Sequence, residues 1–471
     1  MKGHAGLAAA FLKDAERAHW HDRALWYVRE KRDRMARSVP DWEALRETAH
    51  AIKRHALAHL PRYLEEFEQN AAARGAVVHY AVDAAEHNRI ILDILKRRGA
   101  NLVVKSKSML TEECGLNAFL TAHGIEVVES DLGERIIQLA GERPSHIVLP
   151  AIHLRKEEVG EIFHRFLGTA AGESDPATLT QAARAHLREK FLAAKAGISG
   201  VNFAVAETGC VVICTNEGNA DLGTSLPGLY IASMGIEKVI PRMRDLAVFL
   251  RLLSRSATGQ PISAYTSHLF GPRPGQEMHI VIVDNGRTDI LRSERFHRAA
   301  FCIRCGSCLN FCPVYRRSGG HSYSYVIPGP IGMILAPHRN LKEYKDLPYA
   351  SSLCGSCSAA CPVKIDIHRQ IVLWRNEIVA AGELGRFKSA AVKAATAAMK
   401  NARVFAAAGA LARRILRLLP AFLFNNRLTI WGKERDLPEM PAKSFRAQYR
   451  KYQKEKRKQE LSSRRAIGRT S

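Results

Sequence analysis

Four cysteines within eleven residues constrain this chain more than any other feature. Their pattern is C-x2-C-x2-C-x3-C-P, and the positions are Cys302, Cys305, Cys308 and Cys312. A shorter run with the pattern C-x2-C-x3-C-P consists of Cys354, Cys357 and Cys361. Counted back from the second Cys-Pro pair, the missing first cysteine falls on Ser351.

Runs of this spacing are typical of proteins with two iron–sulfur clusters. In two-cluster ferredoxins the fourth cysteine of such a run ligates the other cluster. The rule predicts two [4Fe–4S] clusters that exchange a ligand. The first is expected on Cys302, Cys305, Cys308 and Cys361, and the second on Cys312, Cys354 and Cys357. Zinc is the main alternative, but zinc is typically bound by two spaced pairs of ligands.

The second ligand set is one thiolate short, and four interpretations stay open. Ser351 or water occupies the fourth iron, a partner protein supplies the ligand, the site holds [3Fe–4S], or His368 or Asp366 closes it. We expect a [4Fe–4S] cluster with three cysteines.

Cysteine usage and charge bound the class of protein. Seven of the ten cysteines of this 471-residue chain lie in one patch, which favours metal binding in a reducing cytoplasm over a disulfide scaffold. The longest apolar stretch, 404–424, is interrupted by three arginines, so membrane contact is expected to be peripheral at most, on the inner face of the membrane. The net charge is +24, and residues 441–471 form a basic tail, read here as a solvated segment. No aromatic-interleaved basic patch supports nucleic-acid binding, the weakest of the functions considered.

The order of sequence patterns predicts four regions. Residues 1–75 show helical periodicity up to a stop at Gly75. Residues 76–295 alternate strand-like and helix-like stretches, which predicts an α/β domain with a parallel sheet. Residues 296–380 hold the cysteines on an all-α, ferredoxin-like domain, and 381–471 are helical with the basic tail. The segments HIVLPAI, VNFAVAETGCVVICTN, GLYIAS and EMHIVIVDNG are all expected to be strands of the sheet.

Polar side chains at expected strand ends are candidates for a binding site. The stretch after one strand holds Lys105, Ser106, Lys107 and Ser108, and cations beside a helix N-terminus suit a carboxylate or phosphate. A second stretch holds Glu207, Thr208, Gly209, Asn216, Glu217 and Asn219. Open parallel sheets bind ligands at this edge, although no nucleotide fingerprint is present.

The remaining cysteines and two histidines fit structural roles better. Cys210 and Cys214 lie on one face of an expected strand, and Cys114 lies in an amphipathic stretch, so all three are expected in the core. His146 and His153 flank an expected strand without a paired motif, which favours core or surface positions.

The sequence resembles the lactate-utilisation protein B family over essentially its whole length. The resemblance rests on CIRCGSCLNFCPVY, GGHSYSYVIPGPIG and LCGSCSAACPVKIDI, preceded by the α/β region and followed by LPEMPAKSFRAQYRK. It implies the iron–sulfur subunit of a three-protein complex that oxidises L-lactate to pyruvate. It also implies an α/β domain similar to sugar-phosphate isomerases and CoA transferases. In this family, threonine commonly follows the Thr-Gly pair where this chain has Cys210.

Two functional hypotheses follow. In the first, the chain passes electrons between two clusters, with the other two subunits and an electron acceptor as partners. In the alternative, the α/β domain itself binds and oxidises the hydroxy acid, with the clusters as its electron outlet. Lys105 or Lys107 would then pair with the carboxylate, and Glu207 or Glu217 would act as general base.

Overall fold

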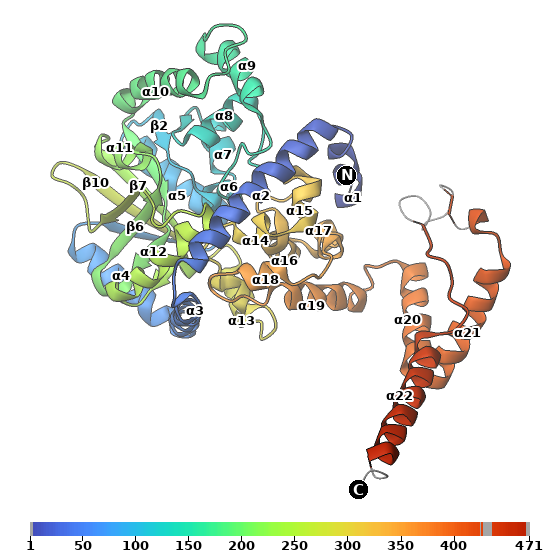
Figure 1. The fold of residues 1–471 in the computed structure, drawn as a ribbon. Helices are drawn as coiled ribbons and strands as arrows, with labels where there is room; N and C mark the ends of the chain where they lie inside the picture. The colour runs from blue at the N-terminus through green and yellow to red at the C-terminus, as the bar shows by residue number, and fades with distance from the viewer. Residues whose placement is uncertain (1–2, 424, 427–435, 468–471) are drawn as a thin grey trace. The chain divides into compact units, whose positions relative to one another are not determined.

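The computed structural model describes residues 3–423, 425–426 and 436–467 (Figure 1). The chain divides into two compact units, Met1–Ala381 and Gly382–Ser471. The first unit contains the α/β region and both cysteine runs, and the functional site lies within it.

Four helices begin the first unit: α1 (His4–Phe11), α2 (Ala15–Arg37), α3 (Trp42–Ala58) and α4 (Leu60–Ala73). The Asp14 side chain accepts the backbone N–H of Arg17 and caps α2. Gly75 follows α4 with a φ of 91°, so a glycine ends this region as the sequence predicts. Helix α2 contacts α12 of the α/β region and α14 and α15 of the cysteine region, and Figure 1 shows it between these two parts.

A six-stranded sheet forms the centre of the α/β region. Its order is β1-β10-β7-β4-β2-β3 and all neighbours are parallel. The strands are β1 (Val77–Ala81), β2 (Leu102–Lys105), β3 (Glu126–Glu129), β4 (Ala196–Gly200), β7 (Leu229–Gly235) and β10 (Glu277–Val283). The expected parallel sheet is therefore confirmed.

Helices cover both faces of this sheet. Ile91 of α5 (Ala84–Arg97) and Leu120 of α7 (Leu116–Ala122) pack on one face, and Phe191 of α10 (Pro176–Ala193) packs on the other. The other helices of the region are α6 (Met109–Glu113), α8 (Leu132–Ala140), α9 (Lys156–Leu167), α11 (Asn219–Ser225), α12 (Met243–Ala257) and α13 (Arg287–Arg292). Burial on both faces explains the continuous runs of Val and Ile in these strands.

One of the expected strands does not join this sheet but forms two strands of another. The stretch VNFAVAETGCVVICTN forms β5 (Phe203–Val205) and β6 (Cys210–Thr215), which pair in antiparallel fashion. They belong to a separate four-stranded sheet with β8 (Val239–Ile240) and β9 (Tyr265–Leu269), in the order β8-β5-β6-β9. The connection is only η1 (Ala206–Thr208) and Gly209, which is too short for the crossover that parallel neighbours require.

The segment HIVLPAI is not a strand, so this prediction was wrong. Its backbone donors are used locally, because the ring Nδ1 of His146 accepts the N–H groups of Val148 and Leu149 at 3.0 and 3.1 Å. The N–H and Oγ–H of Ser145 both donate to the carbonyl of Pro150, at 3.0 Å each. A backbone bonded to itself in this way cannot add to a sheet.

The cysteine region is helical, as expected. Its elements are η3 (His297–Phe301), α14 (Ser307–Asn310), α15 (Pro313–Ser318), η4 (His321–Tyr323), α16 (Gly329–Arg339), α17 (Leu341–Tyr344), η5 (Leu347–Ala350), α18 (Ser356–Ala360) and α19 (Ile367–Ala380). One continuous hydrophobic core joins this region to the N-terminal helices and the smaller sheet.

The second unit contains α20 (Arg386–Lys400), α21 (Ala402–Leu418), η6 (Ala421–Leu423) and α22 (Phe445–Ile467). Among the described residues, no helix combines enough length with enough apolar character to cross a bilayer. The basic tail is described up to Ile467, and its last four residues lie outside the described part.

Candidate iron–sulfur site and the cavity beside it

The first cysteine run wraps through two residues with positive φ. Arg304 has φ 59° and Gly306 has φ 73°, and the backbone N–H of Arg304 donates to the sulfur of Cys302 at 3.4 Å. Cys308 lies on α14, and Cys312 caps α15, where its sulfur accepts the N–H of Tyr315 at 3.4 Å. Because Pro313 has no N–H, it fits the first turn of α15.

The second run repeats this local backbone. Leu353 has φ 58° and Gly355 has φ 80°, at the positions equivalent to Arg304 and Gly306. The N–H of Leu353 donates to the Oγ of Ser351 at 3.1 Å, as the N–H of Arg304 does to the sulfur of Cys302. Ser351 therefore occupies the local geometry of a first cysteine, with oxygen in place of sulfur.

One buried cavity gathers cysteines from both runs. Its lining consists of Ile147, Cys302, Ile303, Cys305, Gly306, Cys308, Ile331, Cys361, Pro362, Val363, Ile365 and Ile367. The four thiols are the only polar side chains in this lining. They are the four that the crossover rule assigns to the first cluster.

The thiols influence one another mostly within the two sets, although Cys357 of the second set also raises the pKa of Cys308. Burial, and then the neighbouring Cys361 and Cys302, raise the pKa of Cys305. Burial, and then Cys312 and Cys354, raise the pKa of Cys357 to about 12. Buried thiolates need a cation to be stable, and a bound metal deprotonates its thiol ligands.

The pattern of the ligands distinguishes an iron–sulfur cluster from zinc. Zinc is typically held by two spaced pairs of ligands, whereas this cavity gathers three cysteines of one run and one of the other. Such a set is the one expected for a cluster in a two-cluster ferredoxin.

Both alternative fourth ligands of the second run have one side-chain atom engaged. His368 Nδ1 bonds the Ser358 hydroxyl at 2.7 Å, and one Asp366 oxygen accepts the Gln370 amide at 2.9 Å. Cys354 is exposed, whereas Cys312 and Cys357 are buried. The second set therefore reaches the protein surface at Cys354, whereas in the first set three cysteines are buried and Cys302 is half-buried.

Two arginines from the N-terminal helices hold the turn that carries Cys361. The guanidinium of Arg46 donates to the carbonyl of Cys361 at 2.8 and 3.0 Å and to that of Ala359 at 2.8 Å. Arg32 donates to the carbonyl of Ala360 at 3.1 Å. Both side chains are buried, and sequence reasoning missed them because more than 300 residues separate the partners.

A second cavity, of about 500 Å³, lies at the carboxyl ends of the parallel strands. From the predicted candidates it collects Ser106, Lys107, Ser108, Asn216, Glu217 and Asn219. At its other side it is lined by Arg304 and Cys305 of the first cysteine run. The binding edge of the sheet therefore adjoins the site predicted for the first cluster.

The structure places the other candidates outside this cavity. Lys105 is buried and its ammonium pairs with Glu129 at 2.7 Å and Glu112 at 3.4 Å. Glu207 is exposed and accepts the N–H of Met243 at 2.8 Å, next to the start of α12. Thr208 and Gly209 form the β5–β6 turn, which packs on α4.

Charges in the cavity explain which groups could act. Burial, reinforced by Asp131, raises the pKa of Glu217 to about 7. The Lys107 ammonium lies 3.4 Å from Glu134, and has no hydrogen-bond partner. A cation and a carboxyl that titrates near neutrality are the groups needed to hold an acid and move a proton.

Sequence reasoning missed the cations between the two cavities. Lys238 and Arg304 line the larger cavity, and the nearby sulfur of Cys302 favours the charged form of both side chains. Burial lowers the pKa of Lys238, whereas for Arg304 the effect of burial is outweighed by Cys302 and two carboxylates, and its pKa is raised. No motif signals them, because the fold brings them together from separate elements.

The remaining cysteines and histidines have mostly structural positions. Cys114 and Cys210 are buried, and Cys214 is half-buried in the cavity wall; burial raises the pKa of each thiol to about 12. His146 is fully buried and donates Nε2–H to Asn310 at 3.0 Å, and burial lowers its pKa to about 3.

Fold and site together define an iron–sulfur protein in which a dicluster region follows an α/β domain. Residues 64–290 match the LUD domain, and residues 298–365 match the 4Fe-4S dicluster domain. The chain belongs to the lactate utilization protein B family. It is 42% identical to the Lactate utilization protein B of Bacillus cytotoxicus, over 89% of this chain and 90% of the relative.

Two further proteins are similar to this chain. The Uncharacterized electron transport protein YkgF of Escherichia coli K12 is 40% identical, over 91% of this chain and 92% of that protein. A crystal structure of a DUF162 family protein from Deinococcus radiodurans aligns with 48% of this chain and 98% of its own, at 15% identity and a TM-score of 0.27, too low to support an argument about the fold.

Proposed function

We propose that this chain is the electron-transfer iron–sulfur subunit of a complex that oxidises L-lactate to pyruvate. The observation that carries the proposal is the cavity lined by cysteines from both runs, together with the names of the relatives. Cys302, Cys305, Cys308 and Cys361 would hold one [4Fe–4S] cluster, and Cys312, Cys354 and Cys357 a second. Such clusters, when bound, exchange single electrons.

The burial of the two ligand sets suggests a direction for electron transfer. The first set is largely enclosed and adjoins the larger cavity, whereas Cys354 of the second set is exposed. A protein partner therefore reaches the second set most directly. The other two subunits, an electron acceptor and a cytoplasmic location belong to this proposal.

Ser351 is the favoured non-cysteine ligand of the second set within the chain. It has the backbone and the N–H donor that Cys302 has, with a shorter bond from Cβ to the ligand atom. Serine coordination, or an iron left open beside it, would distinguish this cluster from one with four thiolates.

Iron analysis and genetics test separate parts of the proposal. Anaerobically purified protein is expected to contain about eight irons per chain, and fewer than about six would contradict two clusters. Deletion of the gene is expected to abolish growth on L-lactate. Growth that persists would contradict the assignment to lactate oxidation but not the cluster assignment.

The second candidate function is that the α/β domain binds and oxidises the hydroxy acid itself. The cavity between Lys107, Glu217 and Arg304 favours it, because its volume of about 500 Å³ suits a small acid. In this version Lys107 pairs with the carboxylate and Glu217 accepts the hydroxyl proton. The hydrogen on the carbinol carbon would leave as a proton, and the two clusters, when bound, would take the two electrons, one each. L-lactate that fails to bind the full-length protein at millimolar concentration would dispose of this candidate.

A further inference from the structure

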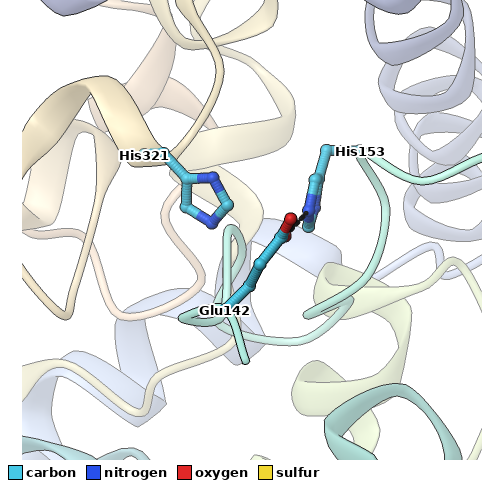
Figure 2. Close-up of side chains that lie close together, drawn as sticks. All are labelled: Glu142, His153 and His321. Carbon is cyan, nitrogen blue, oxygen red and sulfur yellow. Dashed lines mark hydrogen bonds and ion pairs between the residues drawn. The ribbon is translucent and has the colours of Figure 1, made fainter. Parts of the chain in front are cut away.

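Three side chains with metal-ligating groups meet away from the cysteines. Glu142 and His153 come from the irregular segment after α8, and His321 begins η4 in the cysteine region. One carboxylate oxygen and one ring nitrogen from each histidine all lie within 4.8 Å of one another. Figure 2 shows the three side chains directed toward one another.

Both ring nitrogens of His153 have oxygen neighbours. Nδ1 lies 2.7 Å from the Ser145 hydroxyl, which also lies 3.0 Å from the carbonyl of Pro150. Nε2 lies 2.7 Å from a carboxylate oxygen of Glu142, a contact that either a proton or a metal ion can bridge. With an ion at Nε2, Nδ1–H donates to the Ser145 hydroxyl, and the hydroxyl proton goes to the Pro150 carbonyl.

His321 is held in a similar way. One of its ring nitrogens, Nε2, donates to the carbonyl of Arg143 at 2.6 Å, which leaves the lone pair of Nδ1 available. Each histidine thus has one nitrogen fixed by a protein oxygen and offers the other. This is the arrangement of metal-ligating histidines in proteins.

We propose that Glu142, His153 and His321 bind one divalent first-row transition ion, with Zn²⁺ as the probe. Two imidazoles and one carboxylate form a donor set for such ions, whereas Mg²⁺ prefers oxygen ligands. Bonds of roughly 2.0–2.2 Å place tetrahedral ligand atoms about 3.4 Å apart. The Glu142–His153 contact must open slightly and His321 must approach, and the exposed Glu142 and His321 side chains allow this.

The ion would join a segment that lines both cavities to the start of η4. Ile147, between Glu142 and His153, lines the larger cavity and the cysteine-lined one. Gly320, next to His321, packs so closely on Ser145 that a Cβ would collide with the Ser145 carbonyl oxygen. The Tyr315 hydroxyl donates to that same oxygen at 2.6 Å. A metal at this junction is therefore a structural clasp, and its presence does not depend on the proposed function.

The test is metal analysis of full-length protein loaded with its clusters. The protein is dialysed anaerobically against Zn²⁺ with excess Mg²⁺, and zinc and iron per chain are measured by mass spectrometry. Wild type is expected to bind one zinc with no loss of iron. Glu142→Gln and His321→Gln are each expected to weaken zinc binding at least tenfold, with iron and visible absorbance unchanged. Ser145→Ala, which removes the oxygen that orients His153, is expected to weaken it by roughly 10–100-fold.

His123→Gln is the matched control. His123 is exposed in the same α/β region and bonds only the carbonyl of Phe119 in its own helix, so the variant is expected to bind zinc as wild type does. Equal zinc uptake by wild type and His321→Gln would overturn the proposal. So would competition by Mg²⁺, or zinc uptake matched by iron loss, which would place the zinc at the cysteines.

Discussion

The Arg46→Met substitution tests whether the N-terminal helices hold the ligands of the first cluster. Arg46 on α3 is 7% exposed and its guanidinium bonds the carbonyls of Ala359 and Cys361. Methionine retains an apolar stem of similar length and removes all the donors. The turn that presents the Cys361 sulfur then loses this attachment to α3.

The size of the effect follows from the two carbonyls that lose a charged donor. A hydrogen bond to a charged group contributes roughly 1.5–3 kcal/mol, so two carbonyls give about 3–6 kcal/mol. Each 1.36 kcal/mol is a factor of ten in an equilibrium constant. Local opening of the Cys361 turn is therefore expected to become about 10²–10⁴ times more frequent.

Loss of iron to an excess of chelator under anaerobic conditions measures this opening. Each cluster is expected to give one phase of absorbance decay. In Arg46→Met the phase of the first cluster is expected to be about 10²–10⁴ times faster than in wild type. Arg54→Met, which changes an exposed arginine on the same helix, is expected to match wild type. Iron loss from Arg46→Met at the wild-type rate would refute the reasoning.

Three further predictions follow, one on the second cluster and two on the larger cavity, and the last two hold for the second candidate function. Ser351→Cys supplies a fourth thiolate to the second cluster. After exposure to air, this variant is expected to give a smaller electron paramagnetic resonance signal of [3Fe–4S] than wild type does. An unchanged signal would show that residue 351 does not reach iron. Lys107→Ala removes a cation from the cavity wall and is expected to weaken L-lactate binding by roughly 10–100-fold in calorimetry, the value of one charged hydrogen bond; unchanged affinity would place lactate elsewhere. Burial, with Asp131, holds the pKa of Glu217 at about 7, and only the ionised carboxylate accepts a proton. Reduction of the clusters by lactate is therefore expected to increase as the pH rises through about 7, and this increase is expected to disappear in Glu217→Gln. A flat pH profile in wild type would exclude Glu217 as the base.

The geometry of each cysteine run was predictable because it is local. Spacing and glycine placement determine where the loop turns, and Arg304–Gly306 and Leu353–Gly355 adopt the same pair of positive φ values. The same locality placed the missing cysteine of the second run at Ser351. The parallel sheet was predictable as well, since strands buried on both faces are continuously apolar.

The predictions that were wrong depended on contacts that the local sequence does not determine. HIVLPAI has the composition of a strand, but its backbone donors are taken by His146 and Pro150 in an irregular loop. The hairpin at Gly209 diverts two apolar stretches to a second sheet. Lys105 looks like a binding cation, yet Glu129, from a neighbouring strand, neutralises it in the core. Arg46 and Lys238 acquire their roles from contacts that only the fold creates.

The exchange of ligands between the two cysteine runs is the central claim, and substitution of single cysteines tests it most directly. Electron paramagnetic resonance of the reduced protein is recorded for Cys305→Ser, Cys361→Ser, Cys312→Ser and Cys357→Ser. The account predicts that Cys305→Ser and Cys361→Ser alter one cluster signal, and that Cys312→Ser and Cys357→Ser alter the other. If Cys361→Ser and Cys357→Ser altered the same signal while Cys312→Ser altered that of Cys305→Ser, each run would hold its own metal centre and the account would be contradicted.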